Sequence, residues 1–227
     1  MSDLSFLREV PDEELEFLAD IIRDKGGVTN ELGRRGDYGS HTEYAAAIEK
    51  ELLNFGSNTF WFQKDYREVL TEVCDKLKVS YTDSQSVEGI EAELLGKVSS
   101  ELWAKASEEG RRALIEAMDK NEMVLPQAST AAFAAIFRAG GFASYQLSVI
   151  IVNAIAKLVL GRGLSLAANA LLTRALSFVS GPLGVLMGAW TVVSIMGPAY
   201  RVTVPAVICV AGLRQMVENQ QYLPAGH

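Results

Sequence analysis

The charge balance of the chain changes abruptly near residue 128, and this break limits the possible folds more than any motif does. Residues 1–128 hold 15 Lys and Arg against 27 Asp and Glu, a net charge of −12. Residues 129–227 hold six cations against a single acid, Glu218, a net charge of +5. A strongly acidic half is therefore joined to a weakly cationic and very apolar half.

The apolar half contains two long stretches without a formal charge. Residues 139–156 form an 18-residue stretch, and residues 175–200 form a 26-residue stretch. Both reach the length of a membrane-spanning helix. Gly-Pro steps at 181–182 and 197–198 interrupt the longer stretch, so about 14 residues of it remain for one continuous helix.

The acidic half has the pattern of short amphipathic helices. Pro11 and the acids that follow it form a strong helix start, and Ser40 and Glu43 have the spacing of a capping box. Apolar residues at helical spacing predict helices over 11–26, 42–55, 65–77, from 86 onward, and 108–118. No run alternates with a period of two, so no sheet is expected.

These patterns predict an all-α protein in which acidic amphipathic helices of residues 1–128 pack around an apolar, Gly/Ala-rich helical center in residues 129–227. The two parts are either separate domains or one integrated domain. In the second part, Ala131, Ala135 and Ala139 recur every four residues, a spacing that predicts close approach of another helix along this stripe. The final helix is expected over 205–219.

Two groups of residues are candidates for contact with a membrane or a partner. Three adjacent aromatic residues cannot all face one core, so at least one of Phe60, Trp61 and Phe62 is expected at a surface. Gly184 and Gly188 have the four-residue spacing of closely paired helices, and Trp190 lies in the same apolar run.

The sequence offers little for catalysis or for ligand binding. His41 lies in a polar segment without a nucleophile or metal-type neighbor, and the glycine- and arginine-rich segment 33–39 matches no phosphate-binding motif, so it is only a weak candidate anion site. Cys74 and Cys209 are expected to be buried thiols in a reducing compartment. We expect no catalytic residues, metal or cofactor, and the acidic half argues against nucleic acid as a partner.

Three blocks of sequence resemble YaaW-type proteins. They are residues 3–7 with 13–15, residues 53–58 with 66–70 and 73–79, and residues 199–207 with 213–214. That family is similar to the domain of ubiquinol–cytochrome c chaperones. The resemblance implies an all-helical, non-enzymatic protein that acts on a membrane-associated client, and it carries over no catalytic residues.

The last of these blocks contains Tyr200, Arg201, Thr203 and Pro205. The residue before a proline is biased away from the helical conformation, so Pro205 is predicted to end an extended or turn segment. Arg201 is predicted to be a buried structural arginine, held by acidic side chains of the first half or by helix C-terminal carbonyls.

The composition favors a non-enzymatic, membrane-active protein. Its apolar helices, about 131–160 and 164–196, would dock in or permeabilize a membrane after a trigger or on assembly, as a bacterial effector does. The alternatives are a helical chaperone for a membrane-protein client, a purely structural apolar core, and permanent residence in a membrane. The partners expected are membrane lipid or such a client, with a possible homo-oligomer. The absence of a signal peptide predicts a cytoplasmic protein with conditional or peripheral association with the inner membrane.

Overall fold

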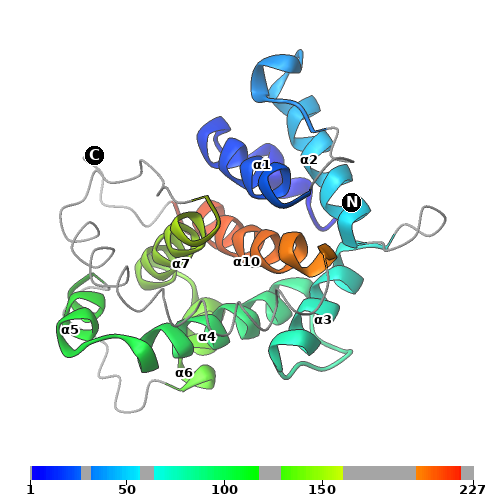
Figure 1. Ribbon diagram of the computed structural model, residues 1–227. Coiled ribbons are helices and arrows are strands. Elements are labelled where there is room, and N and C mark those ends of the chain that lie inside the picture. Colours follow the sequence, from blue (N-terminus) through cyan, green and yellow to red (C-terminus); the bar gives the residue numbers. More distant parts are fainter. Residues whose placement is uncertain (1, 27–31, 57–63, 118–128, 161–197, 221–227) are drawn as a thin grey trace.

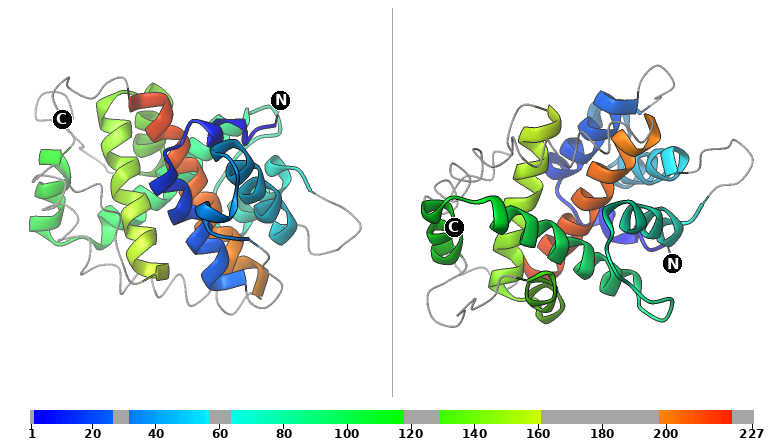
Figure 2. Two further views of the ribbon diagram at one scale, coloured as in Figure 1. Left: turned by 90° about the horizontal axis from the view of Figure 1, so that it is seen from above. Right: turned by 60° about the horizontal axis from the view of Figure 1, so that its bottom comes forward.

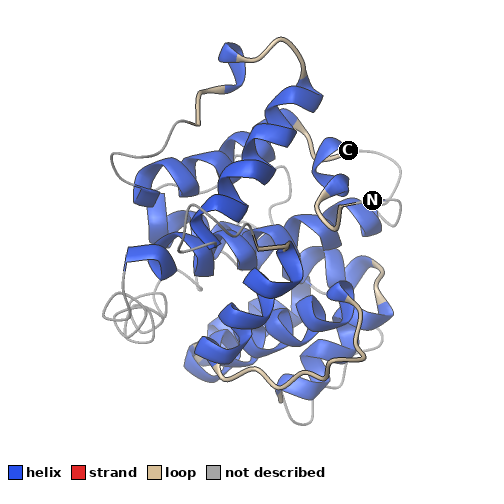
Figure 3. Ribbon diagram, turned by 90° about the vertical axis from the view of Figure 1, so that its right-hand side faces the viewer, coloured by secondary structure: helices blue, strands red, loops and turns tan. Residues whose placement is uncertain are grey.

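A computed structural model of the chain describes residues 2–26, 32–56, 64–117, 129–160 and 198–220. Within these ranges all regular secondary structure is helical, as Figure 3 shows. The prediction of an all-α protein is therefore confirmed.

The α-helices of the acidic half begin and end close to the positions predicted from the sequence, whereas the two short 3-10 helices η1 and η3 were not predicted. They are η1 (Ser5–Arg8), α1 (Asp12–Gly26), η3 (Arg35–Asp37), α2 (His41–Gly56), α3 (Tyr66–Leu77), α4 (Val87–Lys105) and α5 (Glu108–Ala117). Side chains fix several starts, since Asp65 caps α3 through the Glu68 amide and Ser86 caps α4 through the Gly89 amide. At α2, the Ser40 hydroxyl accepts the Glu43 amide as expected.

The apolar half contributes α6 (Thr130–Ala139), α7 (Phe142–Leu160) and α10 (Pro198–Asn219). Gly140 and Gly141 separate α6 from α7, and both have positive φ angles, of 70° and 85°. Glycine adopts this conformation without a steric penalty, and it ends helices for that reason. The apolar region predicted over about 131–160 therefore consists of two helices, because the chain turns sharply at the two glycines.

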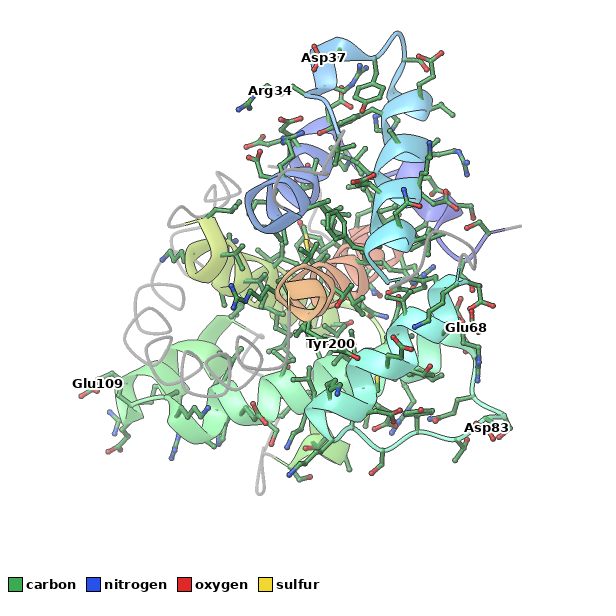
Figure 4. All side chains as sticks on the ribbon, turned by 45° about the vertical axis from the view of Figure 1, so that its right-hand side comes forward. Arg34, Asp37, Glu68, Asp83, Glu109 and Tyr200 are labelled. Carbon is green, nitrogen blue, oxygen red and sulfur yellow. The ribbon has the colours of Figure 1, made fainter. Side chains whose placement is uncertain are left out.

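Helix α10 is the center of the described fold. In Figure 1 it runs across the middle of the molecule, between α1 and α4 and beside α7. It packs against α1, α2, α3, α4 and α7. Viewed nearly end-on in Figure 4, with Tyr200 labelled near one end of it, α10 is surrounded by the other helices. Both views of Figure 2 place α7 alongside it.

Pro205 lies inside α10 and does not end an extended segment, so that prediction is wrong. An interior proline removes one backbone hydrogen bond and costs about 3 kcal/mol relative to alanine. Residues on both sides of it are fully buried, among them Val204, Ala206 and Val207 at 0% exposure. Burial of a helix on all sides outweighs this local cost, and proline therefore remains within the helix.

Helices α4 and α6 cross at very close range, but not through the predicted alanine stripe. A Cβ atom placed on Gly96 would lie 2.7 Å from the backbone nitrogen of Ala134. Ala134 is fully buried there, whereas Ala131, Ala135 and Ala139 are exposed. The alanine spacing therefore predicts the wrong face of α6. The neighboring face, which contains the larger side chains of Phe133 and Phe137, packs into the core.

Two glycines of α4 allow this crossing to be tested. Gly96→Ala is expected to lower the free energy of unfolding by about 1–3 kcal/mol, because its methyl group would press on the α6 backbone. Gly89→Ala is the matched control, since its Cβ would meet no atom closer than 3.5 Å. That change should raise stability by about 0.5 kcal/mol through helix propensity. Urea unfolding of the two variants measures both effects, and equal effects would contradict the close crossing.

No single helix in the described ranges is both long enough and apolar enough to cross a membrane. Helix α6 and residues 142–157 of α7 reach that length and apolarity only when taken together, and they meet at an angle of 117°. Among the large apolar side chains that the structure describes, Ile115 is exposed, at 37%, and the others are buried or partly buried.

Candidate functional site

A salt bridge is buried at the center of the described helices. Nε of Arg214, on α10, donates to Oε2 of Glu91, on α4, over 2.6 Å, and Nη2 donates to Oε1 over 3.3 Å. The two side chains are 6% and 0% exposed. The hydroxyl of Tyr66, on α3, donates to the same carboxylate over 2.7 Å. We call Arg214, Glu91 and Tyr66 the buried ion cluster.

The N-terminal segment is tied to the same arginine. Nη2 of Arg214 donates to the backbone carbonyl of Asp3 over 2.7 Å. The guanidinium carbon also lies 4.2 Å from the center of the Phe6 ring, a cation–π contact with η1. Arg214 thus connects α10 directly with α4 and with the N-terminal segment. Through Glu91 it is also linked to Tyr66 of α3.

Burial and charge act against each other in the buried ion cluster. Burial raises the pKa of the Glu91 carboxyl, while the Arg214 charge and the hydrogen bonds from Arg214 and Tyr66 act in the opposite direction. Burial disfavors the Arg214 cation, but Glu91 outweighs it and raises the pKa of the guanidinium. We therefore regard the pair as ionized, because neutralizing Glu91 would leave a buried cation without a counter-charge.

Such a cluster specifies an arrangement of helices more than it adds to stability. Desolvating two charges costs several kcal/mol, and their attraction repays this only when both partners are present and well aligned. Any motion that carries α10 away from α4 must therefore separate the pair or supply Arg214 with another anion.

Sequence reasoning selected the wrong arginine of α10. Arg201 is exposed, so the prediction that it is a buried structural arginine is wrong. Tyr200 is half-buried, with the ammonium group of Lys76 lying 4.8 Å from its ring center. Thr203 is buried, at 4% exposure, and Arg214 takes the buried place expected for Arg201.

The other predicted contact residues lie outside the described residues. They are Phe60, Trp61, Phe62, Gly184, Gly188 and Trp190. The same holds for the apolar helices predicted over about 164–196, so the roles proposed for these residues stay predictions.

A second polar network joins the segment 32–41 to α1. Nε of Arg35 donates to Oδ1 of Asp12 over 2.9 Å, and Nη2 of Arg23 donates to Glu16 and Asp20 over 2.5 and 2.6 Å. Nη1 of Arg34 lies 3.7 Å from Oε1 of Glu16. The arginines of the candidate anion-binding segment are thus paired with carboxylates of the chain itself, which argues against a site for an external anion.

The network predicts a loss of stability in acid. Burial opposes ionization of Glu16, but the Tyr44 hydroxyl at 2.5 Å, Arg23 and the Arg35 amide lower the pKa of its carboxyl. A lowered pKa in the folded state gives a stabilization that is complete above about pH 4.3 and is lost as the pH falls further. We expect Glu16→Gln to lower the free energy of unfolding by about 0.5–1 kcal/mol at neutral pH. Below about pH 5, the melting temperature of this variant should depend less on pH than that of the wild type. Thermal melts between about pH 3 and 7 measure this, and parallel curves for the two proteins would contradict it.

Both cysteines are buried and free, as predicted. Burial raises the pKa of the Cys74 thiol to about 12 and that of the Cys209 thiol still further. Neither thiol is suited to act as a nucleophile. In the part of the chain that the structure describes, no group of three His, Cys, Asp or Glu side chains is placed to hold a metal ion.

Comparison with known proteins identifies relatives that cover most of the chain. A UPF0174 protein of Helicobacter pylori strain J99 is 41% identical over 230 residues, which cover 93% of this chain and 90% of the relative. A UPF0174 protein named YaaW, from Escherichia coli strain K12, is 30% identical over 239 residues, covering 97% and 96%. This chain belongs to the UPF0174 family.

The UPF0174 relationship confirms the resemblance to YaaW-type proteins. The alignments extend across residue 128, so the relatives align with both the acidic and the apolar half. A second UPF0174 protein of Helicobacter pylori strain J99 is 33% identical over 192 residues, covering 79% of this chain and 92% of the relative. No family model and no solved structure matches the chain. The similarity to ubiquinol–cytochrome c chaperones stays a prediction.

Proposed function

We propose that this UPF0174 protein is a non-enzymatic, membrane-active protein that keeps apolar helices covered until it meets an anionic membrane. In this proposal the protein resides in the cytoplasm and associates conditionally with the inner membrane. The single observation that carries the proposal is the burial of an arginine within the apolar helix α10, held there by one carboxylate from α4.

The packing of α7 and α10 supports the proposal. Residues 147–156 of α7 are almost completely buried, and α10 is buried along most of its length. Helices that are apolar on all sides are stable either in a protein core or in lipid. The Ser144 hydroxyl donates to Gln215 over 2.5 Å between these helices, the type of hydrogen bond that also joins helices in membranes.

The buried ion cluster suggests how opening is controlled. A lipid phosphate can replace Glu91 as the anion that faces Arg214, since guanidinium groups bind phosphate and carboxylate in the same planar manner. A long cationic side chain on an apolar helix can also extend to the membrane interface. An anionic membrane would therefore lower the cost of separating α10 from α4, whereas a neutral membrane would not.

Vesicle flotation tests the proposal with purified full-length protein. Glu91→Gln leaves Arg214 without its counter-charge and should increase the fraction that floats with phosphatidylglycerol vesicles about fivefold or more. Vesicle leakage should rise in parallel, and phosphatidylcholine vesicles should give no increase. Glu93→Gln is the matched control, because Glu93 is an acid of the same helix that pairs with Arg138 at the surface.

A second control separates membrane association from simple destabilization. Gly96→Ala weakens the fold at the crossing of α4 and α6 without touching the buried ion cluster. The proposal is rejected if Glu91→Gln floats no better than a Gly96→Ala variant of equal melting temperature. Co-purification of one specific membrane protein without flotation or leakage would instead indicate the chaperone that the sequence left open.

A further inference from the structure

Helices α7 and α10 are joined at one end by a chain of hydrogen bonds between buried side chains. The Ser144 hydroxyl donates to Oε1 of Gln215 over 2.5 Å, and Nδ2 of Asn219 donates to the same oxygen over 3.2 Å. Oδ1 of Asn219 accepts the backbone amide of Gly141, just before α7, over 2.6 Å. Ser144, Gln215 and Asn219 are 0%, 5% and 5% exposed. Neutral groups thus bond the N-terminal end of α7 to the C-terminal end of α10.

The same two helices, which lie side by side in both views of Figure 2, also approach each other very closely. A Cβ atom placed on Gly212 of α10 would lie 2.5 Å from Cγ2 of Val152 on α7, and 3.7 Å from the carbonyl oxygen of Ser148. Any larger residue at position 212 would press the two helices apart. Close approach at a small residue, combined with hydrogen bonds between helices, is the means by which helices associate in membranes.

Helix α10 is held to the acidic half by contacts of another kind. It packs against α1, α2, α3 and α4, and the buried side chains described in α1 are apolar apart from Glu14. Oε2 of Glu14 has no hydrogen-bond partner among the described residues, so its burial opposes this packing. The Arg214 guanidinium can exchange Glu91 for another anion. The hold of the acidic half on α10 therefore depends largely on hydrophobic burial and on an exchangeable ion pair.

We propose that α7 and α10 enter the membrane as one preformed pair, from which α1, α2, α3 and α4 come away. This inference rests on the proposed function and names the part of the protein that enters lipid. Hydrophobic attraction between helices disappears in lipid, because lipid tails are as apolar as the side chains. The contacts of α10 with the acidic half lose their driving force there, whereas the hydrogen bonds to α7 and the close packing at Gly212 persist.

A disulfide between α7 and α10 tests whether the pair stays together. In the variant Val152→Cys/Gly212→Cys the two Cβ atoms would be 4.0 Å apart, within the range of about 3.5–4.5 Å that disulfides span. Cys74→Ala and Cys209→Ala remove the native thiols, so that this is the disulfide that forms. The reduced and oxidized forms of the same protein are compared, and any loss of stability from the substitutions is common to both.

A tether between α3 and α10 is the matched control. The Lys76 ammonium group lies 4.8 Å from the center of the Tyr200 ring, and both side chains reach the surface. In the variant Lys76→Cys/Tyr200→Cys, with the native cysteines replaced as before, a short bis-maleimide joins the two thiols. This tether keeps the acidic half on α10 and does not touch α7. The same variant treated with N-ethylmaleimide is the untethered reference.

Flotation with phosphatidylglycerol vesicles distinguishes the two locks. The oxidized α7–α10 protein should float to within about twofold of its reduced form, because the pair is never separated. The α3–α10 tether should lower the floating fraction about fivefold or more, because it holds the closed state. Loss of flotation on oxidation, or unchanged flotation with the tether, would overturn the inference. If neither protein floats before it is locked, the proposed function fails and this inference with it, so the two failures are distinguishable.

Discussion

Arg214→Met lowers the free energy of unfolding by about 3–5 kcal/mol, because it leaves the Glu91 carboxylate buried without its counter-charge. Removing both charges has a much smaller effect. In the double variant Glu91→Leu/Arg214→Met, packed apolar side chains replace the ion pair, and stability should be well above that of either single variant, although the buried Tyr66 hydroxyl loses its acceptor. Urea unfolding of Arg214→Met, of Glu91→Leu and of the double variant gives the coupling energy directly.

The stability of the double variant relative to the single variants distinguishes an effect of charge from an effect of packing. If charge matters, the second substitution restores stability that the first one removes. If the cluster acts through packing alone, the double variant should be less stable than either single variant. A double variant that is as stable as the wild type but no longer floats with anionic vesicles would join the cluster to the proposed function. The Asp3 carbonyl loses its donor in both variants that lack Arg214, so it does not affect the comparison between them.

Phe133→Ala is expected to cost about 3–5 kcal/mol, since it removes an aromatic side chain that is only 2% exposed. Its ring center lies 6.3 Å from that of Trp103, on α4, and so it bridges the acidic and the apolar half. Circular dichroism and tryptophan fluorescence, followed together in urea, measure the loss. Phe133→Leu keeps most of the volume and should cost less than half as much.

The same experiment tests the division of the chain at residue 128. If the two halves form one integrated domain, both probes should report a single shifted transition. Two transitions, with only one of them shifted, would indicate separate domains. The buried core contains residues from both sides of residue 128, and we therefore expect a single transition.

The helices of the acidic half could be predicted because their signals are local. A capping residue and an apolar stripe within one turn or two determine where α3 and α4 begin, and the sequence contains both. The start of α10 could not be found in this way. Pro205 is a local signal against a helix, and the burial that overrides it depends on helices from distant parts of the chain, from α1 to α7.

The buried ion cluster carried a weaker signal. Glu91 occupies a helical position in line with Val87 and Leu94, so an acid interrupts an otherwise apolar stripe of α4. Arg214 likewise interrupts the apolar run of α10. Each residue alone could have been noticed as a charge on a buried face. Their pairing across 123 positions follows only from the tertiary fold.

The position of α10 in the chain has a consequence for biosynthesis. The helix on which α1, α2, α3, α4 and α7 pack is also the last described helix to leave the ribosome. Nascent chains grow at about 5–20 residues per second, so the earlier helices wait on the order of ten seconds for their common partner. During that interval their apolar faces are available to chaperones or to the membrane surface. Packing of the described helices is therefore completed only after α10 has emerged, and truncation before residue 198 would remove the helix on which α1, α2, α3, α4 and α7 pack.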